Sequence, residues 1–401
     1  MASTTICRQW TAKYPELGTD PLPVEPNVST EYFERERKRI FQRSWLNVGR
    51  VEDIAQPGDY FVKQLEILKT SIIIVRGKDG VIRGFHNVCQ HRGNRLADDY
   101  RGRARSFVCG FHGWTYDLAG RLVRVPDEQE FCDFEKSEHE LTSVATNVWE
   151  GFIFINVDPH PTETLQQWMG ELYEQYRGYP LDTMTEVARY LATVNTNWKV
   201  FMDITQESYH VPCLHGRIVP DSNTSKGNPF CHLSSIRIFR KHRASSVYAN
   251  PEHQPTPAEA VAYKFGTTVL EGATVHDPLH RCLNPDGVSN WAFDSNVIFP
   301  NLIFHVGNGW YITYNFWPLA VDRTLMEYRF YMTQANSHGE RVSQEFSKVL
   351  ARDLLREDLS TLESVQAGLA SGALTHMPLS DQEIMLRHSY KVVEDFVSSN
   401  Q

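Results

Sequence analysis

Two short clusters of metal-ligand side chains constrain this chain more than any other feature. Cys89 and His91 form the first cluster, and Cys109 and His112 form the second. Each cluster offers one thiolate and one imidazole, which suits a [2Fe–2S] cluster in which two imidazoles replace two thiolates on one iron. Tetrahedral zinc accepts the same donor set, and two cysteines can instead form a disulfide or be unrelated. The spacing favours iron–sulfur and leaves these alternatives open.

Glycine follows each ligand segment, at Gly93 and Gly113, where a backbone can turn or approach an inorganic cluster without a Cβ in the way. With these flanks the sequence resembles the Rieske non-haem iron oxygenases. Their pattern, C-x-H-R-G followed by C-x-x-H-G-W-x-Y-x-x-x-G, is matched by residues 89–93 and 109–120. The resemblance includes Trp114, Tyr116 and Gly120 as well as the ligands. It implies a Rieske cluster bound by Cys89, His91, Cys109 and His112.

Composition restricts the remaining classes of function. The chain has 401 residues, of which 41% are hydrophobic, enough for two globular domains. A formal charge of −9 argues against nucleic acid as the main partner. No apolar run reaches the length of a membrane span, and the first residues lack the apolar core of a secretory signal, so we expect a cytoplasmic protein that does not use a membrane. The 7 cysteines are scattered and do not indicate a disulfide framework.

The pattern of hydrophobic residues predicts three segments. Residues 1–44 form an irregular arm and a helix, which we expect to pack on the catalytic domain. Residues 45–158 consist of short β-branched and aromatic runs broken by glycine, which predict a β-rich domain with both ligand clusters in hairpin loops. In residues 159–401 we expect a helix at 165–176, strands between 295 and 333, and a long helix at 343–369. The resulting fold class is α+β, with a β-rich Rieske domain and a helix-grip-like catalytic domain whose central antiparallel sheet is surrounded by helices.

A second group of candidate ligands lies in the later part of the chain. Asp203, Glu207 and His210 are spaced four and three apart, which places them on one face if the segment is a single helix. On a continuing helix His215 points elsewhere, but Pro212 can break the helix and bring His215 back. Two histidines and one carboxylate form the facial triad of non-haem Fe(II) oxygenases. Alone this spacing is weak evidence, but beside the upstream clusters it becomes strong.

The resemblance implies the other residues of this site. The family pattern, an acidic residue, two residues, histidine, four residues and histidine, is filled by Glu207, His210 and His215. The carboxylate ligand is expected on the C-terminal helix, where Asp358 matches best and Glu357 and Asp353 are weaker candidates. In the family an acidic residue bridges two subunits of a trimer, so Glu207 is expected to connect His112 of one subunit to His210 of the next. Asp203 stands where the arene dioxygenases often have asparagine, and is a candidate catalytic residue.

The resulting functional hypothesis is a terminal oxygenase. It uses O2 and electrons from NAD(P)H, delivered by a separate reductase or ferredoxin, because no G-x-G-x-x-G fingerprint follows a strand here. The reaction is mono- or dioxygenation, or oxidative demethylation, of a small aromatic or other organic substrate. We expect a homotrimer, and an added β subunit is also compatible with the sequence.

Glutamate at position 207 resembles the relatives that act on quaternary amines, so an oxygenase of a quaternary ammonium compound is the alternative. Trp310, Tyr311, Tyr314 and Trp317 are candidates for an aromatic cage around such a cation, although strand alternation lets only some of them face inward. A Rieske-type electron carrier without oxygen chemistry and a zinc-stabilised binding module are the remaining alternatives.

Overall fold

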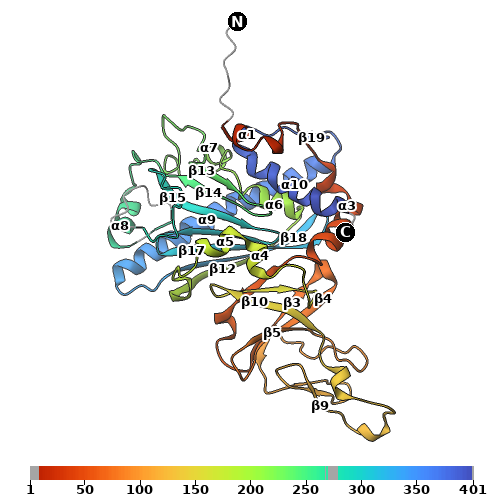
Figure 1. Ribbon diagram of the computed structural model, residues 1–401. Helices are drawn as coiled ribbons and strands as arrows, with labels where there is room; N and C mark the ends of the chain where they lie inside the picture. The colour runs from red at the N-terminus through yellow and green to blue at the C-terminus, as the bar shows by residue number, and fades with distance from the viewer. Residues whose placement is uncertain (1–8, 267, 270–278, 400–401) are drawn as a thin grey trace. The chain divides into compact units, whose positions relative to one another are not determined.

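The computed structural model describes residues 9–399, except 267 and 270–278, and divides the chain into two compact units (Figure 1). Arg37–Trp168 forms the small unit. The segments on either side, up to Glu36 and from Met169, form the large unit. The predicted fold class is confirmed, because the small unit is β-rich and the large unit combines an antiparallel sheet with helices.

The small unit is built on a seven-stranded antiparallel sheet and a three-stranded sheet. The Ile72–Val75 run lies in a central strand and is completely buried, as expected for β-branched residues covered on both faces. In sheet order the seven strands are β2 (Leu46–Arg50), β11 (Phe152–Asn156), β10 (Ser143–Trp149), β5 (Ile82–His86), β4 (Thr70–Arg76), β3 (Asp59–Leu65) and β6 (Arg101–Arg103). The three strands are β7 (Phe107–Val108), β8 (Thr115–Tyr116) and β9 (Leu122–Arg124).

The two ligand clusters lie in loops of the small unit, as the sequence predicts. Cys89 and His91 follow β5, and Cys109 and His112 lie in the hairpin loop between β7 and β8. The loops have the same backbone turn. The N–H of Gly93 donates to the carbonyl of Cys89, and the N–H of Gly113 donates to the carbonyl of Cys109. Both glycines have a positive φ, 76° and 74°, which a residue with a side chain rarely adopts.

The large unit contains a second seven-stranded antiparallel sheet. Four of its strands extend the runs predicted between 295 and 333, while the other three were not predicted because they mix polar and apolar residues. In sheet order the strands are β12 (Met184–Val194), β18 (Arg323–Thr333), β17 (Trp310–Ala320), β16 (Leu302–Gly307), β15 (Trp291–Ile298), β14 (Arg243–Tyr248) and β13 (Ser235–Ile238). A separate two-stranded ladder pairs β1 (Leu22–Pro23) with β19 (His376–Met377).

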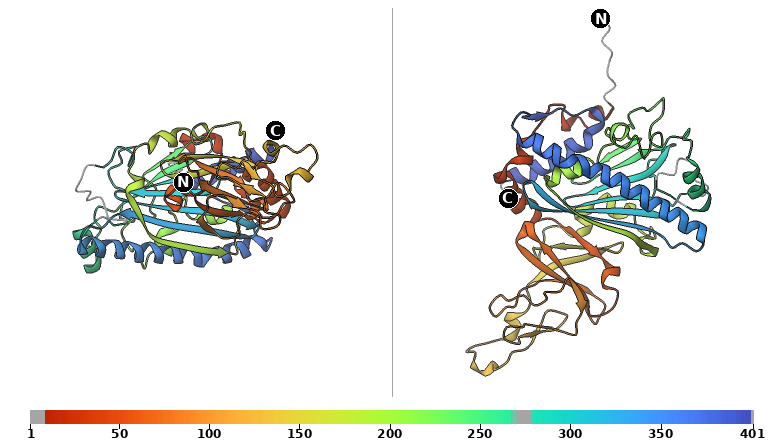
Figure 2. Two further views of the ribbon diagram at one scale, coloured as in Figure 1. Left: turned by 90° about the horizontal axis from the view of Figure 1, so that it is seen from below. Right: turned by 180° about the vertical axis from the view of Figure 1, so that it is seen from behind.

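The long helix α9 (His338–Ala370) runs along one face of this sheet (Figure 2). Its predicted position is confirmed, and it begins where the Ser337 hydroxyl accepts the N–H of Glu340. The helix predicted at 165–176 is two short helices, because Gly170 between them has a φ of 57°. The other α-helices are α1 (Gln9–Lys13), α2 (Glu25–Val28), α3 (Thr30–Glu36), α4 (Leu165–Met169), α5 (Glu171–Gln175), α6 (Trp198–Asp203), α7 (Val211–Leu214), α8 (Pro257–Phe265) and α10 (Ile384–Ser398).

A buried ion pair anchors α6, the helix that leads into the second group of candidate ligands. Lys199 Nζ lies 2.6 Å from Glu36 Oε1, and the indole N–H of Trp198 donates to the same carboxylate at 2.9 Å. Both charged side chains are almost completely buried. Removing one partner of such a pair typically costs about 3–5 kcal/mol, because the other charge is left unpaired. The contact therefore fixes the start of the ligand segment against α3.

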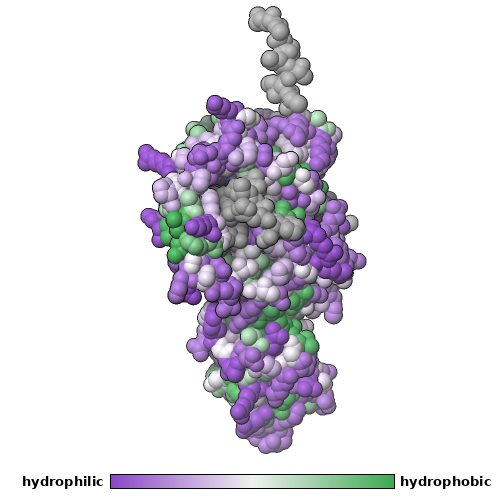
Figure 3. Space-filling model, turned by 90° about the vertical axis from the view of Figure 1, so that its left-hand side faces the viewer, coloured by the Kyte–Doolittle hydropathy of each residue, from purple (hydrophilic) through white to green (hydrophobic). Residues whose placement is uncertain are grey.

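The surface drawn in Figure 3 is mainly hydrophilic, and its hydrophobic side chains form small patches. Among the described residues, no helix is both long enough and apolar enough to cross a bilayer.

Candidate metal and substrate site

A cavity of about 140 Å³ lies between the sheet of the large unit and helix α9. Side chains alternate between the two faces of a strand, and residues from one face of five neighbouring strands, β14 to β18, line the cavity. On the other side, α9 contributes residues spaced as one helical face, ending at Asp358. The strand residues are Ser245, Val247, Phe293, Ser295, His305, Trp310, Ile312, Tyr314 and Tyr328, and the α9 residues are Ala351, Leu354, Leu355 and Asp358.

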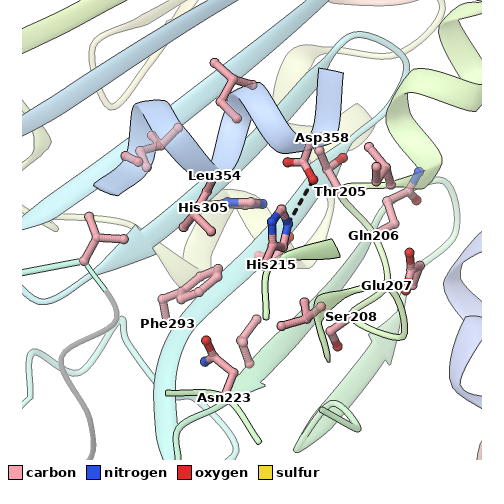
Figure 4. A pocket seen from close by; sticks show the side chains of 18 of the residues that line it. Thr205, Gln206, Glu207, Ser208, His215, Asn223, Phe293, His305, Leu354 and Asp358 are labelled. Atoms are coloured by element: carbon pink, nitrogen blue, oxygen red, sulfur yellow. Dashed lines mark ion pairs between the residues drawn. The ribbon is translucent and has the colours of Figure 1, made fainter. Parts of the chain in front are cut away.

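Three predicted ligands meet at one end of the cavity. Asp358 Oδ1 lies 3.0 Å from His215 Nε2, as Figure 4 shows. The same oxygen lies 3.7 Å from His210 Nε2. One ligand atom from each residue lies within 4.8 Å of the others. The sequence therefore identified a set that the fold brings together, from two segments far apart in the chain.

The hydrogen bonds around these three residues suit a cation. His210 Nδ1 lies 2.5 Å from Glu207 Oε1, and His215 Nδ1 lies 2.9 Å from Glu357 Oε2. Ionised carboxylates only accept, so each Nδ1 carries a ring proton. Each Nε2, the nitrogen nearer to Asp358, is then the atom that would offer a lone pair to a bound metal ion. Asp358 Oδ1 is buried and has no hydrogen-bond partner of regular geometry. Two lone pairs and a carboxylate oxygen facing one point form a donor set for Fe(II).

The helix predicted to carry Asp203, Glu207 and His210 on one face is wrong. Helix α6 ends at Asp203, and a new one-turn helix, α7, begins after His210. The chain leaves the helix because the side chains of Thr205 and Gln206 bond back to the carbonyl of Met202. Pro212 lies in the first turn of α7, where proline is tolerated, rather than breaking an existing helix. His210 and His215 therefore occupy the two caps of a single turn.

Asp203 lies away from the other candidate residues. The hydroxyl of Tyr390 donates to its Oδ2 at 3.0 Å, and its side chain is not among the described residues that line the cavity. Burial raises the pKa of Asp203 to about 7, with Tyr390, Arg243 and Lys199 opposing the shift. No contact in the described residues links this carboxyl to the cavity, so its position suggests a role in stability and pH dependence.

We expect an Asp203→Asn variant to be more stable than the wild type at pH 7.5 but not at pH 4. Between about pH 4 and 7 the unfolded carboxyl ionises while the buried one keeps its proton, so wild-type stability falls as the pH rises. Asparagine cannot ionise and can still accept from Tyr390. The gain at pH 7.5 is on the order of 2–4 kcal/mol. Urea unfolding at both pH values measures it, with Asp353→Asn as the control; equal pH profiles for wild type and Asp203→Asn contradict the expectation.

Glu207 is held by its own segment as well as by the histidine. Its Oε2 accepts the backbone N–H groups of Tyr209 and His210, while Oε1 accepts from the His210 ring. Both oxygens are therefore fixed, and the carboxylate orients the imidazole and holds its ring proton on Nδ1.

Glu357, a weaker candidate ligand, contacts the back of His215 instead of the metal point. Glu357 accepts the Nδ1 proton of His215, as Glu207 accepts the Nδ1 proton of His210. Asp353, the other weak candidate, pairs with Arg352 at 2.8 Å and does not line the cavity. The sequence contained a usable signal for Glu357, because a ligating histidine needs an acceptor at its second nitrogen and Glu357 adjoins the ligand Asp358.

The four predicted cluster ligands also converge in the small unit. His91 Nδ1 and His112 Nδ1 lie 3.1 Å apart, and Cys89 and Cys109 are both buried. His91 stacks on Trp114 at 4.8 Å with an interplanar angle of 8°, which fixes the ring. Two imidazole nitrogens directed at one point and two buried thiols beside them fit a [2Fe–2S] cluster with mixed ligands.

Hydrogen-bond donors surround the two sulfurs. Burial raises the pKa of the Cys109 thiol, but donors that include the backbone N–H groups of Phe111 and His112 outweigh it, and the pKa lies below its ordinary value. Cys89 Sγ lies 3.5 Å from the Tyr116 hydroxyl. Donors to the sulfurs are one means by which a protein sets the potential of an iron–sulfur cluster. Tyr116, singled out by the motif, therefore has a direct physical role.

His305 lines the cavity but was not singled out by the sequence. Burial lowers its pKa to about 4, with the backbone carbonyl of Thr205 opposing the shift. Its imidazole is therefore neutral at physiological pH. A lone histidine in a strand carries no spacing signal, so only the fold could identify it.

Comparison with known proteins supports both sites. Residues 181–399 match the family "Ring hydroxylating alpha subunit (catalytic domain)", and residues 44–145 match "Rieske [2Fe-2S] domain". The chain is 29% identical over 353 residues to a carnitine monooxygenase oxygenase subunit from Acinetobacter baumannii, covering 86% of this chain and 84% of that protein. It is 34% identical over 196 residues to the benzene 1,2-dioxygenase alpha subunit from Pseudomonas putida, covering 47% and 43%.

Solved structures share the fold. A quaternary ammonium Rieske monooxygenase in complex with L-carnitine superposes with a TM-score of 0.72 at 22% identity, over 94% of this chain and 96% of that one. Naphthalene 1,2-dioxygenase from a Rhodococcus species, bound to indole, superposes with a TM-score of 0.77 at 20% identity, over 99% and 100%.

Proposed function

We infer the activity of this chain from the premise that it belongs to the ring-hydroxylating alpha-subunit family and is a Rieske non-haem iron oxygenase. We propose that it is a terminal oxygenase that hydroxylates or oxidatively demethylates a small, uncharged organic substrate, most simply an aromatic one. A separate NAD(P)H-dependent reductase or ferredoxin supplies the electrons. The observation that carries the proposal is the convergence of His210, His215 and Asp358 at the end of a mainly apolar cavity.

The contacts support the proposed residue roles. Cys89, His91, Cys109 and His112 would hold the [2Fe–2S] cluster, and His210, His215 and Asp358 would hold the mononuclear Fe(II). When bound, the first group supplies one-electron transfer and the second supplies O2 activation. Glu207 and Glu357 keep the ring protons of the two ligand histidines on Nδ1. The apolar walls exclude water from the reacting centre.

A quaternary ammonium substrate is the second candidate, and three observations favour it. Trp310 and Tyr314, two of the four residues considered for an aromatic cage, line the cavity, whereas Tyr311 and Trp317 are not among its described lining residues. No lysine or arginine is among the described lining residues either, so no basic side chain there repels a cation. Several relatives are named as carnitine or glycine betaine monooxygenases.

The proposed assembly is a homotrimer in which Glu207 of one subunit approaches His112 of the next. Two features support it. His112 is partly exposed, as electron transfer to another subunit requires. Phe111 and Tyr209, next to His112 and Glu207, are exposed aromatic residues of the kind that interfaces bury.

The test of the activity is incorporation of labelled oxygen. Holoenzyme supplied with NADH, a generic Rieske reductase and ¹⁸O2 is screened against benzene-sized aromatics, their methyl ethers, carnitine and glycine betaine. We expect one class to give coupled O2 uptake and a product, and a hydroxylated product to carry ¹⁸O by mass. Demethylation is scored by formaldehyde. Uptake that yields only peroxide with every class contradicts the proposed activity, and turnover of carnitine or glycine betaine alone selects the second candidate.

A further inference from the structure

The sheet side of the cavity wall contains an unusual polar residue. In β16 every residue is buried except His305, which is partly exposed. Because β16 is a central strand, hydrogen-bonded to β15 and β17, this exposed surface faces the cavity and not the outside of the molecule. The ring is held between Phe293, at a centroid distance of 5.2 Å, and Tyr314, at 5.1 Å. His305 is therefore a rigid part of the wall.

The polarity of this imidazole is fixed by its surroundings. The backbone carbonyl of Thr205 can only accept, so it keeps a proton on the ring nitrogen that it faces. In the neutral ring the other nitrogen carries a lone pair. The Nε2 atom is buried without a hydrogen-bond partner among the described residues. The cavity wall thus contains a hydrogen-bond acceptor, His305 Nε2, to which no described residue donates.

Ser295 adds a second unsatisfied group at the same place. It is paired with His305 in the β15–β16 ladder, so both side chains lie on the face that lines the cavity. The Ser295 hydroxyl is also buried without a partner in the described part of the chain. Two adjacent buried polar groups that lack partners are rare in native proteins and call for a ligand or water that satisfies them.

We propose that His305 and Ser295 form the polar pair that orients the substrate, with the imidazole accepting a hydrogen bond from a neutral O–H or N–H group on the substrate. This inference rests on the proposed function and narrows its substrate class. The cavity of about 140 Å³ suits one six-membered ring, because an apolar cavity of about 150 Å³ holds benzene. The substrate is then a single-ring compound with a hydroxyl or amine group that donates to His305. A quaternary ammonium group has no such donor.

Ligand binding without turnover tests the pair. Fluorobenzene and phenol have similar size, but only phenol can donate to His305. Fluorobenzene is titrated anaerobically into holoenzyme and followed by ¹⁹F line broadening, and phenol is then added as competitor. We expect wild-type protein to bind phenol about tenfold more tightly than fluorobenzene, since an unpaired buried acceptor is costly. His305→Phe should remove this preference, and His305→Gln, which keeps an acceptor, should retain part of it.

Ile312→Val is the matched control. Ile312 is an apolar lining residue paired with His305 in the β16–β17 ladder, and its substitution should leave the ratio of the two affinities unchanged. Equal affinity for the two ligands in wild type, or the same phenol preference in His305→Phe, overturns the proposal. If His305→Phe fails to fold, the variants His305→Gln and Ser295→Ala still test the proposal. A preference for phenol that is unaltered in both variants contradicts the role of the pair. No reductase or O2 is present, so this failure is distinct from a failure of the oxygenase activity.

Discussion

Asp358→Ala protein is expected to have no oxygenase turnover and a normal [2Fe–2S] cluster. Asp358 supplies the only carboxylate oxygen in the described group of three ligands. Two neutral imidazoles alone bind Fe(II) weakly, because the site loses its negative charge and its third donor. The iron content should fall from about three to about two per chain, while the EPR signal of the reduced cluster is unchanged.

Asp353→Ala is the control for this variant. Asp353 lies on the same helix but pairs with Arg352 and does not line the cavity, so turnover and iron content should stay at wild-type values. Normal turnover of Asp358→Ala would show that another carboxylate, such as Glu357, is the ligand.

Glu207→Gln is expected to slow turnover by roughly 10–100-fold while both metal centres remain bound. The amide can accept from His210 through its oxygen, but its NH2 group then faces the backbone N–H groups of Tyr209 and His210, which the carboxylate accepts at present. The segment must shift, and His210 loses the negative charge behind it. If Glu207 also contacts a neighbouring subunit, re-oxidation of the reduced cluster by O2 and substrate should slow by the same factor.

Glu357→Gln separates these two effects. It removes the matching charge behind His215, so any effect of that charge on iron binding is common to the two variants, but it leaves Glu207 unchanged. With iron restored to saturation, the rate of cluster re-oxidation should therefore be close to wild type. Equal slowing in both variants argues against a special role of Glu207 between the centres, and wild-type turnover of Glu207→Gln refutes the bridge.

Local spacing was enough to propose the two cysteines and four histidines as candidate ligands, although for His210 and His215 it became strong evidence only beside the upstream clusters. Each cysteine and its histidine lie within one loop, together with a glycine that fixes the turn. The cluster ligands could therefore be recognised from residues that are close together in the sequence. His210 and His215 likewise cap one helical turn. The α+β fold and helix α9 could be predicted because their hydrophobic periodicity is long and regular. Asp358 needed the resemblance as well, because nothing in the helix pattern distinguishes it from other acidic residues.

Residues defined by tertiary contacts could not be predicted. Asp203 fits a helical spacing with Glu207, but side-chain bonds to the carbonyl of Met202 end the helix between them, and propensity does not report such bonds. His305 acquires its role only when β16 forms a wall of the cavity. Glu357 acquires its role when α9 reaches His215, and its position beside Asp358 was the one usable signal for it in the sequence. The three edge-side strands of the large sheet are too mixed in polarity to be recognised without their neighbours.

The central claim is that one chain holds a Rieske cluster and a separate mononuclear iron. Iron and acid-labile sulfide content, measured together with the EPR spectrum of the dithionite-reduced protein, tests it most directly. We predict a red-brown protein with about three irons and two sulfides per chain and a Rieske-type signal. A colourless protein that contains zinc, or one with two irons and no mononuclear site after reconstitution with Fe(II), would contradict it.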